Sequence, residues 1–233
     1  MSLDFITLSK KDKIINDYTG RAKKRLYFAY RFYLKDAVQQ LFILKLRYAN
    51  KFSPYNLFNG KGKKALDVGC SYGYISRFLQ HLGYTVVGID LSFLALRKAS
   101  RKIMVVHNDA QYAPFKQHAF DLIILFDIIE HVERPLKLIY NSLNMLNDNG
   151  VCLISTPHRG IIQKIYDIIR NEEHKHIFTD HSLLKSLKRI STSHIIIKYL
   201  LLPIPPNLFN RYFIIPNTPS FITSDMVIMV KRS

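Results

Sequence analysis

The chain has 233 residues, of which 48% are hydrophobic and 12% aromatic, and this composition supports one domain with a sizeable core and excludes a disordered tail. Its net charge of +17 is uneven, with 15 Lys and Arg against 4 Asp and Glu in residues 1–64, 9 against 8 in 65–160, and 10 against 5 in 161–233. These basic flanks predict either a phosphate-bearing partner, on RNA or on an anionic membrane surface, or simply a solvated surface.

Cysteine usage and hydropathy indicate where the protein works. Cys70 and Cys152 lie in apolar strand patterns and no CxxC pair occurs, which argues against disulfides and thiolate zinc sites. The N-terminus has no secretion-signal pattern, and prolines interrupt the uncharged stretch between Lys198 and Arg211, which is also too short to span a membrane. We expect a cytoplasmic protein, either free or attached to the membrane periphery.

Residues 1–60 are predicted to form a helical N-terminal arm, a candidate lid, because 10–52 is rich in Lys, Arg, Tyr, Phe and Leu without proline. Residues 61–233 alternate between strands and helices, which predicts a mostly parallel sheet covered on both faces. The strands are expected at 65–68, 85–90, 103–107, 120–126, 151–155, 194–202 and 226–231, and the helices at 74–82, 93–101, 134–146, 161–170 and 182–189. A long loop, 203–225, joins the last two strands and is predicted to be functional.

The first strand of the main domain ends in a glycine-containing turn. Gly69 and Gly73 would let the backbone approach a ligand in conformations that a side chain forbids. A dinucleotide fingerprint, G-x-G-x-x-G, needs a glycine where Ser71 stands and a last glycine one position beyond Gly73. The spacing therefore weakens an NAD-binding interpretation.

Three acids, Asp67, Asp90 and Asp109, lie at or near the ends of three successive predicted strands, where open α/β sheets bind ligands. Asp90 has nearly the offset at which an acid meets ribose hydroxyls, and Asp109 could accept a hydrogen bond from an exocyclic amine such as that of adenine. These acids would repel a pyrophosphate and attract a sulfonium with an ammonium group, which favours S-adenosylmethionine over NAD. Singly, Asp90 could instead be a helix N-cap and Asp109 the start of a turn.

Five segments in order resemble the successive motifs of class I S-adenosylmethionine-dependent methyltransferases, nearest the branch that contains ubiquinone-biosynthesis O-methyltransferases. They are Leu66-Asp-Val-Gly-Cys-Ser-Tyr-Gly, Val87-Gly-Ile-Asp-Leu-Ser, Asn108-Asp-Ala-Gln-Tyr-Ala-Pro-Phe, Phe120-Asp-Leu-Ile-Ile-Leu-Phe-Asp-Ile-Ile-Glu-His-Val and Gly150-Val-Cys-Leu-Ile-Ser-Thr-Pro. The resemblance implies an enzyme with a Rossmann-like, seven-stranded, mostly parallel sheet, helices on both faces and an antiparallel last strand.

The resemblance also implies where the cofactor binds. Asp67, Gly69 and Gly73 would surround its methionine end, Asp90 would take the ribose, and Asp109 with Ala110 would meet the adenine. The full set of cofactor-binding residues predicted is Asp67, Gly69, Cys70, Gly73, Asp90, Leu91, Asp109, Ala110 and Phe126.

The segment Asp127-Ile-Ile-Glu-His131 follows the fourth predicted strand, beside the expected position of the donor methyl. If it begins a helix, Asp127, Glu130 and His131 share one face and could bind Mg²⁺ or Mn²⁺. Similar arrangements serve as metal ligands in some ubiquinone-pathway O-methyltransferases and in small-RNA 3′-end 2′-O-methyltransferases. The alternative is a structural pair of Glu130 and His131, with His131 as the catalytic general base.

The predicted reaction is O-methylation of a small-molecule, lipid-linked or glycan acceptor by in-line transfer. RNA methylation through the basic arm is less favoured, because its aromatic residues lie in a helix rather than on a sheet platform; a non-catalytic module is the third alternative. His174 and His176 either face the substrate or belong to a solvated loop. Residues 10–52 and 203–225 are expected either to cover the acceptor site and rest on an anionic membrane surface, or to pack on the sheet.

Overall fold

The computed structural model describes residues 35–53, 56–157, 176, 178, 180–190, 194–201, 215–216 and 225–232. The chain divides into two compact units, Met1–Gln40 and Leu41–Ser233, and, apart from residues 35–40 at the start of the first described helix, everything below concerns the second. The first part of the predicted helical arm, residues 1–34, the helix predicted at 161–170, His174 and most of the loop 203–225 lie outside the described residues.

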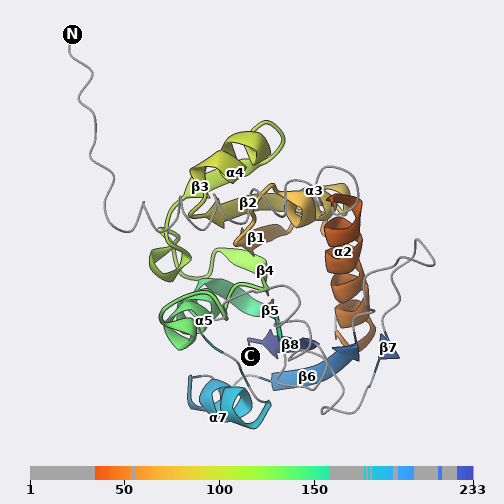
Figure 1. The fold of residues 1–233 in the computed structure, drawn as a ribbon, viewed down its shortest axis with the longest axis vertical. Coiled ribbons are helices and arrows are strands. Elements are labelled where there is room, and N and C mark those ends of the chain that lie inside the picture. The colour runs from red at the N-terminus through yellow and green to blue at the C-terminus, as the bar shows by residue number, and fades with distance from the viewer. Residues whose placement is uncertain are drawn as a thin grey trace, which may run out of the picture. The chain divides into compact units, whose positions relative to one another are not determined.

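A single mixed sheet organises this unit, with the strand order β3-β2-β1-β4-β5-β8-β6-β7 (Figure 1). Its strands are β1 (Lys64–Val68), β2 (Thr85–Asp90), β3 (Met104–His107), β4 (Phe120–Phe126), β5 (Leu146–Pro157), β6 (His194–Leu201), β7 (Ile215–Pro216) and β8 (Asp225–Lys231). Strands β1 to β5 pair in parallel, and β8 inserts antiparallel between β5 and β6. The predicted Rossmann-like sheet with an antiparallel last strand is confirmed, and the two-residue β7 extends its edge.

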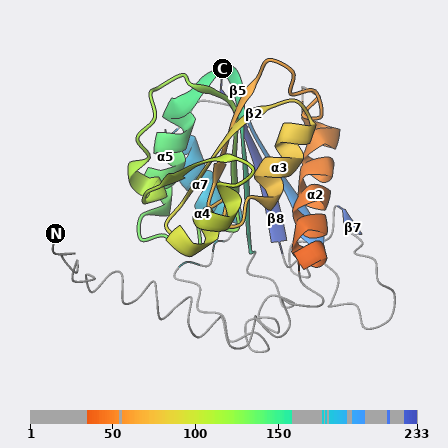
Figure 2. The ribbon, with the colours of Figure 1, turned by 90° about the horizontal axis from the view of Figure 1, so that it is seen from above.

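Helices cover both faces of the sheet (Figure 2). They are α2 (Lys35–Phe52), α3 (Tyr74–His81), α4 (Phe93–Ala99), α5 (Pro135–Met145) and α7 (Asp180–Ile190), with a 3₁₀ turn, η2 (Ala110–Tyr112). The helices α2 and α3 pack on one face and α5 and α7 on the other. Alternate residues of β4 supply the two cores, with Leu122 and Ile124 on the α2 side and Ile123 and Leu125 on the α5 side. This burial on both faces explains why β4 is a continuous apolar run.

Local signals in the sequence fix where the helices begin and end. Gly73 and Gly83, in left-handed conformations with φ of 73° and 95°, flank α3, and left-handed backbone is least costly for glycine. Ser92 caps α4 by accepting a hydrogen bond from the Ala95 N–H. Pro135 opens α5, a position where its missing N–H costs nothing. These helix ends therefore determine where the loops that carry the candidate site begin and end.

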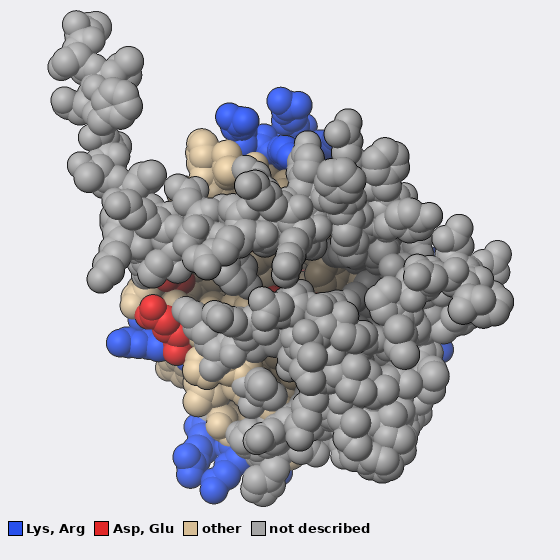
Figure 3. Space-filling view, in the orientation of Figure 1, with Lys and Arg blue, Asp and Glu red and all other residues tan. Residues whose placement is uncertain are grey.

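Basic side chains gather at the top and bottom of the face in Figure 3, over α4 and α7. Arg97, Lys98, Arg101 and Lys102 are exposed on and after α4, and Lys185, Lys188 and Arg189 are exposed on α7. Within the described part of the chain, no helix has the length and hydropathy to cross a membrane.

Candidate active site at the carboxyl ends of the strands

The turn after β1 is shaped by two left-handed glycines, Gly69 and Gly73, with φ of 76° and 73°. A Cβ at Gly69 would lie 2.7 Å from the Ile128 side chain, and a Cβ at Gly73 would lie 2.7 Å from that of Ile103. Both positions therefore need glycine for backbone conformation and for space. The result is a turn whose backbone lies at the carboxyl edge of the sheet, between β1, β2 and β4.

Asp90, at the end of β2, ties this turn to the next helix. Its two carboxylate oxygens accept hydrogen bonds from the Ser71 N–H at 2.8 Å and from the Ser92 N–H at 2.7 Å. Ser71 stands where the fingerprint has glycine and adopts a φ of 47°, held by that bond. The cap of α4 is Ser92 rather than Asp90. Since each carboxylate oxygen has two lone pairs, Asp90 retains acceptor capacity for a ligand's hydroxyl groups.

Asp109 follows β3 and caps η2 by accepting a hydrogen bond from the Gln111 N–H at 2.9 Å. The turn interpretation of this residue is therefore confirmed, and its contact with adenine stays a prediction. Its neighbour Ala110 is buried. On the other side of β2, Leu91 is 41% exposed, which leaves an apolar side chain at the ligand-facing edge next to Asp90.

Asp67 is buried at the end of β1 and accepts a hydrogen bond from the Ser76 hydroxyl on α3. Burial, reinforced by the negative charge of Asp90, raises the pKa of Asp67 to about 7 in spite of that bond. Ser76 therefore fixes the position of an acid whose ionised form any cation bound nearby would stabilise. In the described residues, neither Asp67 nor Asp90 forms an ion pair with a basic side chain.

Two predicted cofactor residues point their side chains into the core. The Cys70 thiol packs against Gly88 of β2 so closely that a Cβ at Gly88 would lie only 2.6 Å from the Cys70 Sγ. Burial raises the pKa of the Cys70 thiol above its ordinary range. The Phe126 ring is 6% exposed and stacks on Phe42 of α2 with centroids 6.0 Å apart. Any contact of these two residues with a cofactor is therefore left to the backbone.

The carboxyl edge from β1 to β3 fits S-adenosylmethionine by its donor set. It combines a backbone turn that only glycine allows with two acids, Asp67 and Asp90, that form no ion pair with a basic side chain of the described residues. A ligand with an ammonium and a sulfonium group would supply the missing positive charge, whereas a pyrophosphate would meet like charge. This edge is therefore complementary to a cationic cofactor.

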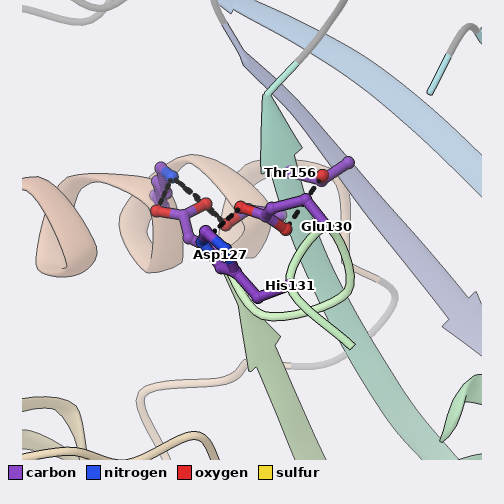
Figure 4. Close-up of polar contacts among 6 residues, drawn as sticks. Asp127, Glu130, His131 and Thr156 are labelled. Carbon is purple, nitrogen blue, oxygen red and sulfur yellow. Dashed lines mark hydrogen bonds and ion pairs between the residues drawn. The ribbon is translucent and has the colours of Figure 1, made fainter. Parts of the chain in front are cut away.

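The segment after β4 is a series of turns (Figure 4), so the condition for the predicted metal site, that a helix begins at Asp127, is not met. Asp127 has a left-handed φ of 52°, which no residue inside an α-helix adopts. Its N–H donates to the Ser155 carbonyl of β5 at 2.9 Å, so the chain continues the sheet contact before turning away. Helix α5 begins only at Pro135.

A buried lysine contacts Asp127. Lys45 of α2 has no exposed surface, and its Nζ lies 2.7 Å from both carboxylate oxygens of Asp127 and 3.1 Å from the Ser155 Oγ. The Ser155 hydroxyl in turn donates to Asp127 at 2.7 Å. Burial alone would raise the pKa of Asp127, but the adjacent ammonium and these hydrogen bonds lower it below its usual value. Asp127 is therefore an ionised acid with its counterion built in.

Glu130 and His131 occupy the same turn series, and their side chains lie close together (Figure 4) but differ in exposure. Glu130 is 1% exposed and accepts a hydrogen bond from the Thr156 hydroxyl at 3.1 Å. The side chain of His131 is 36% exposed, and its Nε2 lies 3.9 Å from the Glu130 Oε1. The His176 N–H donates to the Glu130 carbonyl at 3.2 Å. Of Asp127, Glu130 and His131, His131 has the most exposed side chain, at 36% against 29% for Asp127 and 1% for Glu130.

The predicted metal site does not fit this arrangement. Among the described residues, which include Asp127, Glu130 and His131, no group of three His, Cys, Asp or Glu side chains is arranged to bind a metal ion. Lys45 contacts both carboxylate oxygens of Asp127, and one carboxylate oxygen of Glu130 accepts a hydrogen bond from Thr156. The structure therefore does not support Mg²⁺ or Mn²⁺ binding here.

Sequence reasoning missed Lys45, Ser76, Ser155 and Thr156, which hold the acids of the site. One signal for Lys45 was present, because Phe42, Lys45, Leu46 and Ala49 recur at helical spacing and so place the lysine on the apolar stripe of α2. A lysine on such a stripe is buried and needs an acidic partner. The three hydroxyl residues carry no comparable signal.

Fold and site together define the class of protein. A sheet of this strand order, with a glycine turn and acids at the carboxyl ends of β1 to β3, is that of the S-adenosylmethionine-dependent methyltransferases. The chain matches the model of the methyltransferase domain family over residues 34–190, and it belongs to that family.

Relatives agree with this assignment. The chain is 34% identical over 110 residues to a ubiquinone biosynthesis O-methyltransferase of Glaesserella parasuis, covering 42% of this chain and 47% of that protein. It is 26% identical over 127 residues to the mitochondrial ubiquinone biosynthesis O-methyltransferase of Schizosaccharomyces pombe, covering 50% and 45%. The chain thus spans about half the length of the curated relatives it matches.

Two crystal structures show the same fold. A methyltransferase from Thermotoga maritima, described as a possible histamine N-methyltransferase, has a TM-score of 0.70 at 15% identity and covers 94% of this chain and 99% of its own. A methyltransferase from Archaeoglobus fulgidus has a TM-score of 0.63 at 19% identity and covers 82% and 93%. Such low identities establish the fold and leave the acceptor open.

Proposed function

We propose that this methyltransferase transfers the methyl group of S-adenosylmethionine to a hydroxyl oxygen of a small-molecule, lipid-linked or glycan acceptor. The observation that carries the proposal is the acid edge, where Asp67, Asp90 and Asp109 follow three adjacent parallel strands around a glycine turn. The similarity to ubiquinone biosynthesis O-methyltransferases supports oxygen as the attacked atom.

On the donor side, the chain's residues bind and orient. Asp90 would accept the ribose hydroxyls with the lone pairs left free by Ser71 and Ser92. Asp67 and the turn at Gly69 and Gly73 would surround the cationic methionine end, and Asp109, Ala110 and Leu91 would lie against the adenine. When bound, S-adenosylmethionine supplies a methyl group already activated by a positively charged sulfur.

On the acceptor side, alignment and proton removal are the remaining tasks. The half-exposed imidazole of His131 would take the hydroxyl proton as a general base. Glu130, held by Thr156, would stabilise the imidazolium that results, because its carboxylate lies 3.9 Å from the ring nitrogen. The methyl acceptor oxygen would then attack in line with the departing sulfur.

Labelled methyl donor tests this function against three acceptor pools: hydroxylated small molecules, lipid-linked or glycan hydroxyls, and RNA. We expect label in one of the first two pools, on oxygen by mass spectrometry. His131→Ala should lower kcat about 10²-fold or more, as general bases contribute. His118→Ala, an exposed histidine near the opposite edge of the sheet, is the matched control and should leave kcat unchanged. Label in RNA alone, or on nitrogen, would overturn the proposal.

The basic flanks extend the proposal to a location for the acceptor. An anionic membrane surface near residues 10–52 and 203–225 would present a lipid-linked hydroxyl to the site. Co-sedimentation with vesicles should then require anionic lipid, weaken as salt rises, and diminish in the double variant Phe209→Ser and Phe213→Ser. Binding that ignores lipid charge would confine the acceptor to free small molecules.

A further inference from the structure

The turn after β4 contains two acids, Asp127 and Glu130, with the imidazole of His131 beside them. In a protein that used a divalent ion here, the metal would neutralise these acids and fix the turn. The structure provides a different cation: the Lys45 ammonium, which lies 2.7 Å from both oxygens of Asp127. A side chain of α2 thus occupies the place beside Asp127 that a metal ion would take.

Burial of the Lys45 ammonium costs desolvation free energy, and specific contacts offset that cost. A fully buried lysine is rare, because removing an ammonium from water is unfavourable unless the charge is paired and hydrogen-bonded. Here the pairing is complete, since Asp127 and Ser155 both contact the Nζ and Ser155 also donates to Asp127. The Phe42 ring, with its centroid 5.8 Å from the Nζ, adds a favourable face.

The network also fixes an unfavourable backbone conformation. Asp127 has a φ of 52°, a left-handed conformation that costs a non-glycine residue about 1–2 kcal/mol. It is held by its N–H bond to Ser155 and by the ion pair to α2. Because the chain reverses at Asp127, this conformation determines the path of the residues that follow, including Glu130 and His131.

We propose that Lys45 is a positioning residue that takes the place of a divalent metal ion: its ammonium fixes the Asp127 carboxylate and so holds the turn carrying His131 beside the acceptor. Lys45 acts through Asp127 and does not touch the substrate. The inference rests on the proposed function in assigning His131 to the acceptor side, and its claim about the cation stands on geometry alone.

A manganese titration of the full chain, without donor or acceptor, tests the cation claim independently of turnover. Wild type and Asp127→Asn should bind Mn²⁺ equally weakly, within twofold, as followed by electron paramagnetic resonance of the free ion. A wild-type affinity ten times that of Asp127→Asn or more would show that the acid binds metal and would overturn the proposal.

Turnover of the donor-saturated enzyme tests the positioning role. Lys45→Met should lower kcat tenfold or more and leave the donor Kd within twofold of wild type. The turnover of both wild type and Lys45→Met should be unchanged by chelator. Lys188→Met, an exposed lysine of α7, is the control and should match wild type throughout.

The double variant Lys45→Met and Asp127→Asn removes both charges of the ion pair and keeps the test decisive if Lys45→Met unfolds. It should melt at a higher temperature than Lys45→Met and still show the tenfold loss of kcat. A double variant that turns over like wild type, or wild-type turnover that chelator abolishes, would overturn the proposal. If wild type binds no donor at all, the proposed function fails, while the manganese titration still decides the role of Lys45.

Discussion

The carboxyl edge of the sheet has two halves that hold their acids in different ways. From β1 to β3, Asp90 accepts hydrogen bonds from backbone N–H groups and Asp67 from one hydroxyl. At β4 and β5, side chains of other elements hold Asp127 and Glu130, and one of them is a buried ammonium. The first half thus keeps negative charge that a cationic cofactor could neutralise, whereas in the second half Lys45 neutralises Asp127, which would suit the neutral hydroxyl acceptor that we propose.

The turn of the first half should be the most sensitive position. Gly69→Ala should lower the free energy of unfolding by about 2–5 kcal/mol, from left-handed strain and from overpacking against Ile128, and weaken donor binding at least tenfold. Gly62→Ala is the matched control, because Gly62 has the same φ of 76° but open space around its Cα. Denaturant unfolding and calorimetry measure both effects; equal losses in the two variants would show that crowding at Gly69 is unimportant.

Burial of Asp67 predicts a pH-dependent stability. Its pKa is raised from 3.8 to about 7 in the folded protein, so the folded state binds the proton more tightly than the unfolded chain. Stability from this group is therefore fully present below about pH 4 and is lost as pH rises to about 7, by up to about 1.4 kcal/mol for each pH unit.

Asp67→Asn should remove that loss. Relative to wild type it should be equally stable near pH 4 and progressively more stable up to about pH 8, by thermal unfolding at each pH. The difference curve between the two proteins isolates this one group. A flat difference curve would mean that the buried carboxyl is not destabilised by ionisation.

The second half should respond differently. Thr156→Val removes the hydroxyl that donates to the buried Glu130 and should cost about 1–3 kcal/mol of stability. It should also lower kcat while leaving donor affinity unchanged. Thr85→Val, at the exposed start of β2, should be nearly neutral in all three measurements. A loss of donor affinity in Thr156→Val would blur the distinction between the halves.

The same division decides how much the sequence could predict. In the first half the contacts join residues that are close in the sequence, 9 residues apart for Asp67 and Ser76 and 19 for Ser71 and Asp90. A glycine turn followed by regularly spaced acids is therefore sufficient to predict a cofactor site there. In the second half, Lys45 lies 82 residues from Asp127 and Thr156 lies 26 from Glu130. The sequence singled out Asp127 and Glu130 there and offered a metal ion as one possible partner, but it did not identify Lys45, because that pairing depends on how α2 packs on the sheet.

The strands, their alternation with helices along the chain and the helices on both faces followed from apolar runs between helical segments, because burial on both faces leaves a clear pattern in β4. The helix at Asp127 that the metal site would have required does not form for a tertiary reason: the N–H of Asp127 donates a hydrogen bond to β5, which overrides the local helical spacing. The two-residue β7 was not predicted, since a strand so short has no periodicity.

The central claim is that the β1–β3 half binds the donor and the β4–β5 half does not. Calorimetry with S-adenosylhomocysteine on wild type, Asp90→Ala and Glu130→Gln, with the exposed Asp148→Ala as control, tests it most directly. Hydrogen bonds to a charged group contribute about 1.5–3 kcal/mol, so Asp90→Ala should bind about tenfold or more weakly, while Glu130→Gln and Asp148→Ala stay within twofold of wild type. Equal affinity of Asp90→Ala and wild type, or a comparable loss in Glu130→Gln, would contradict the claim.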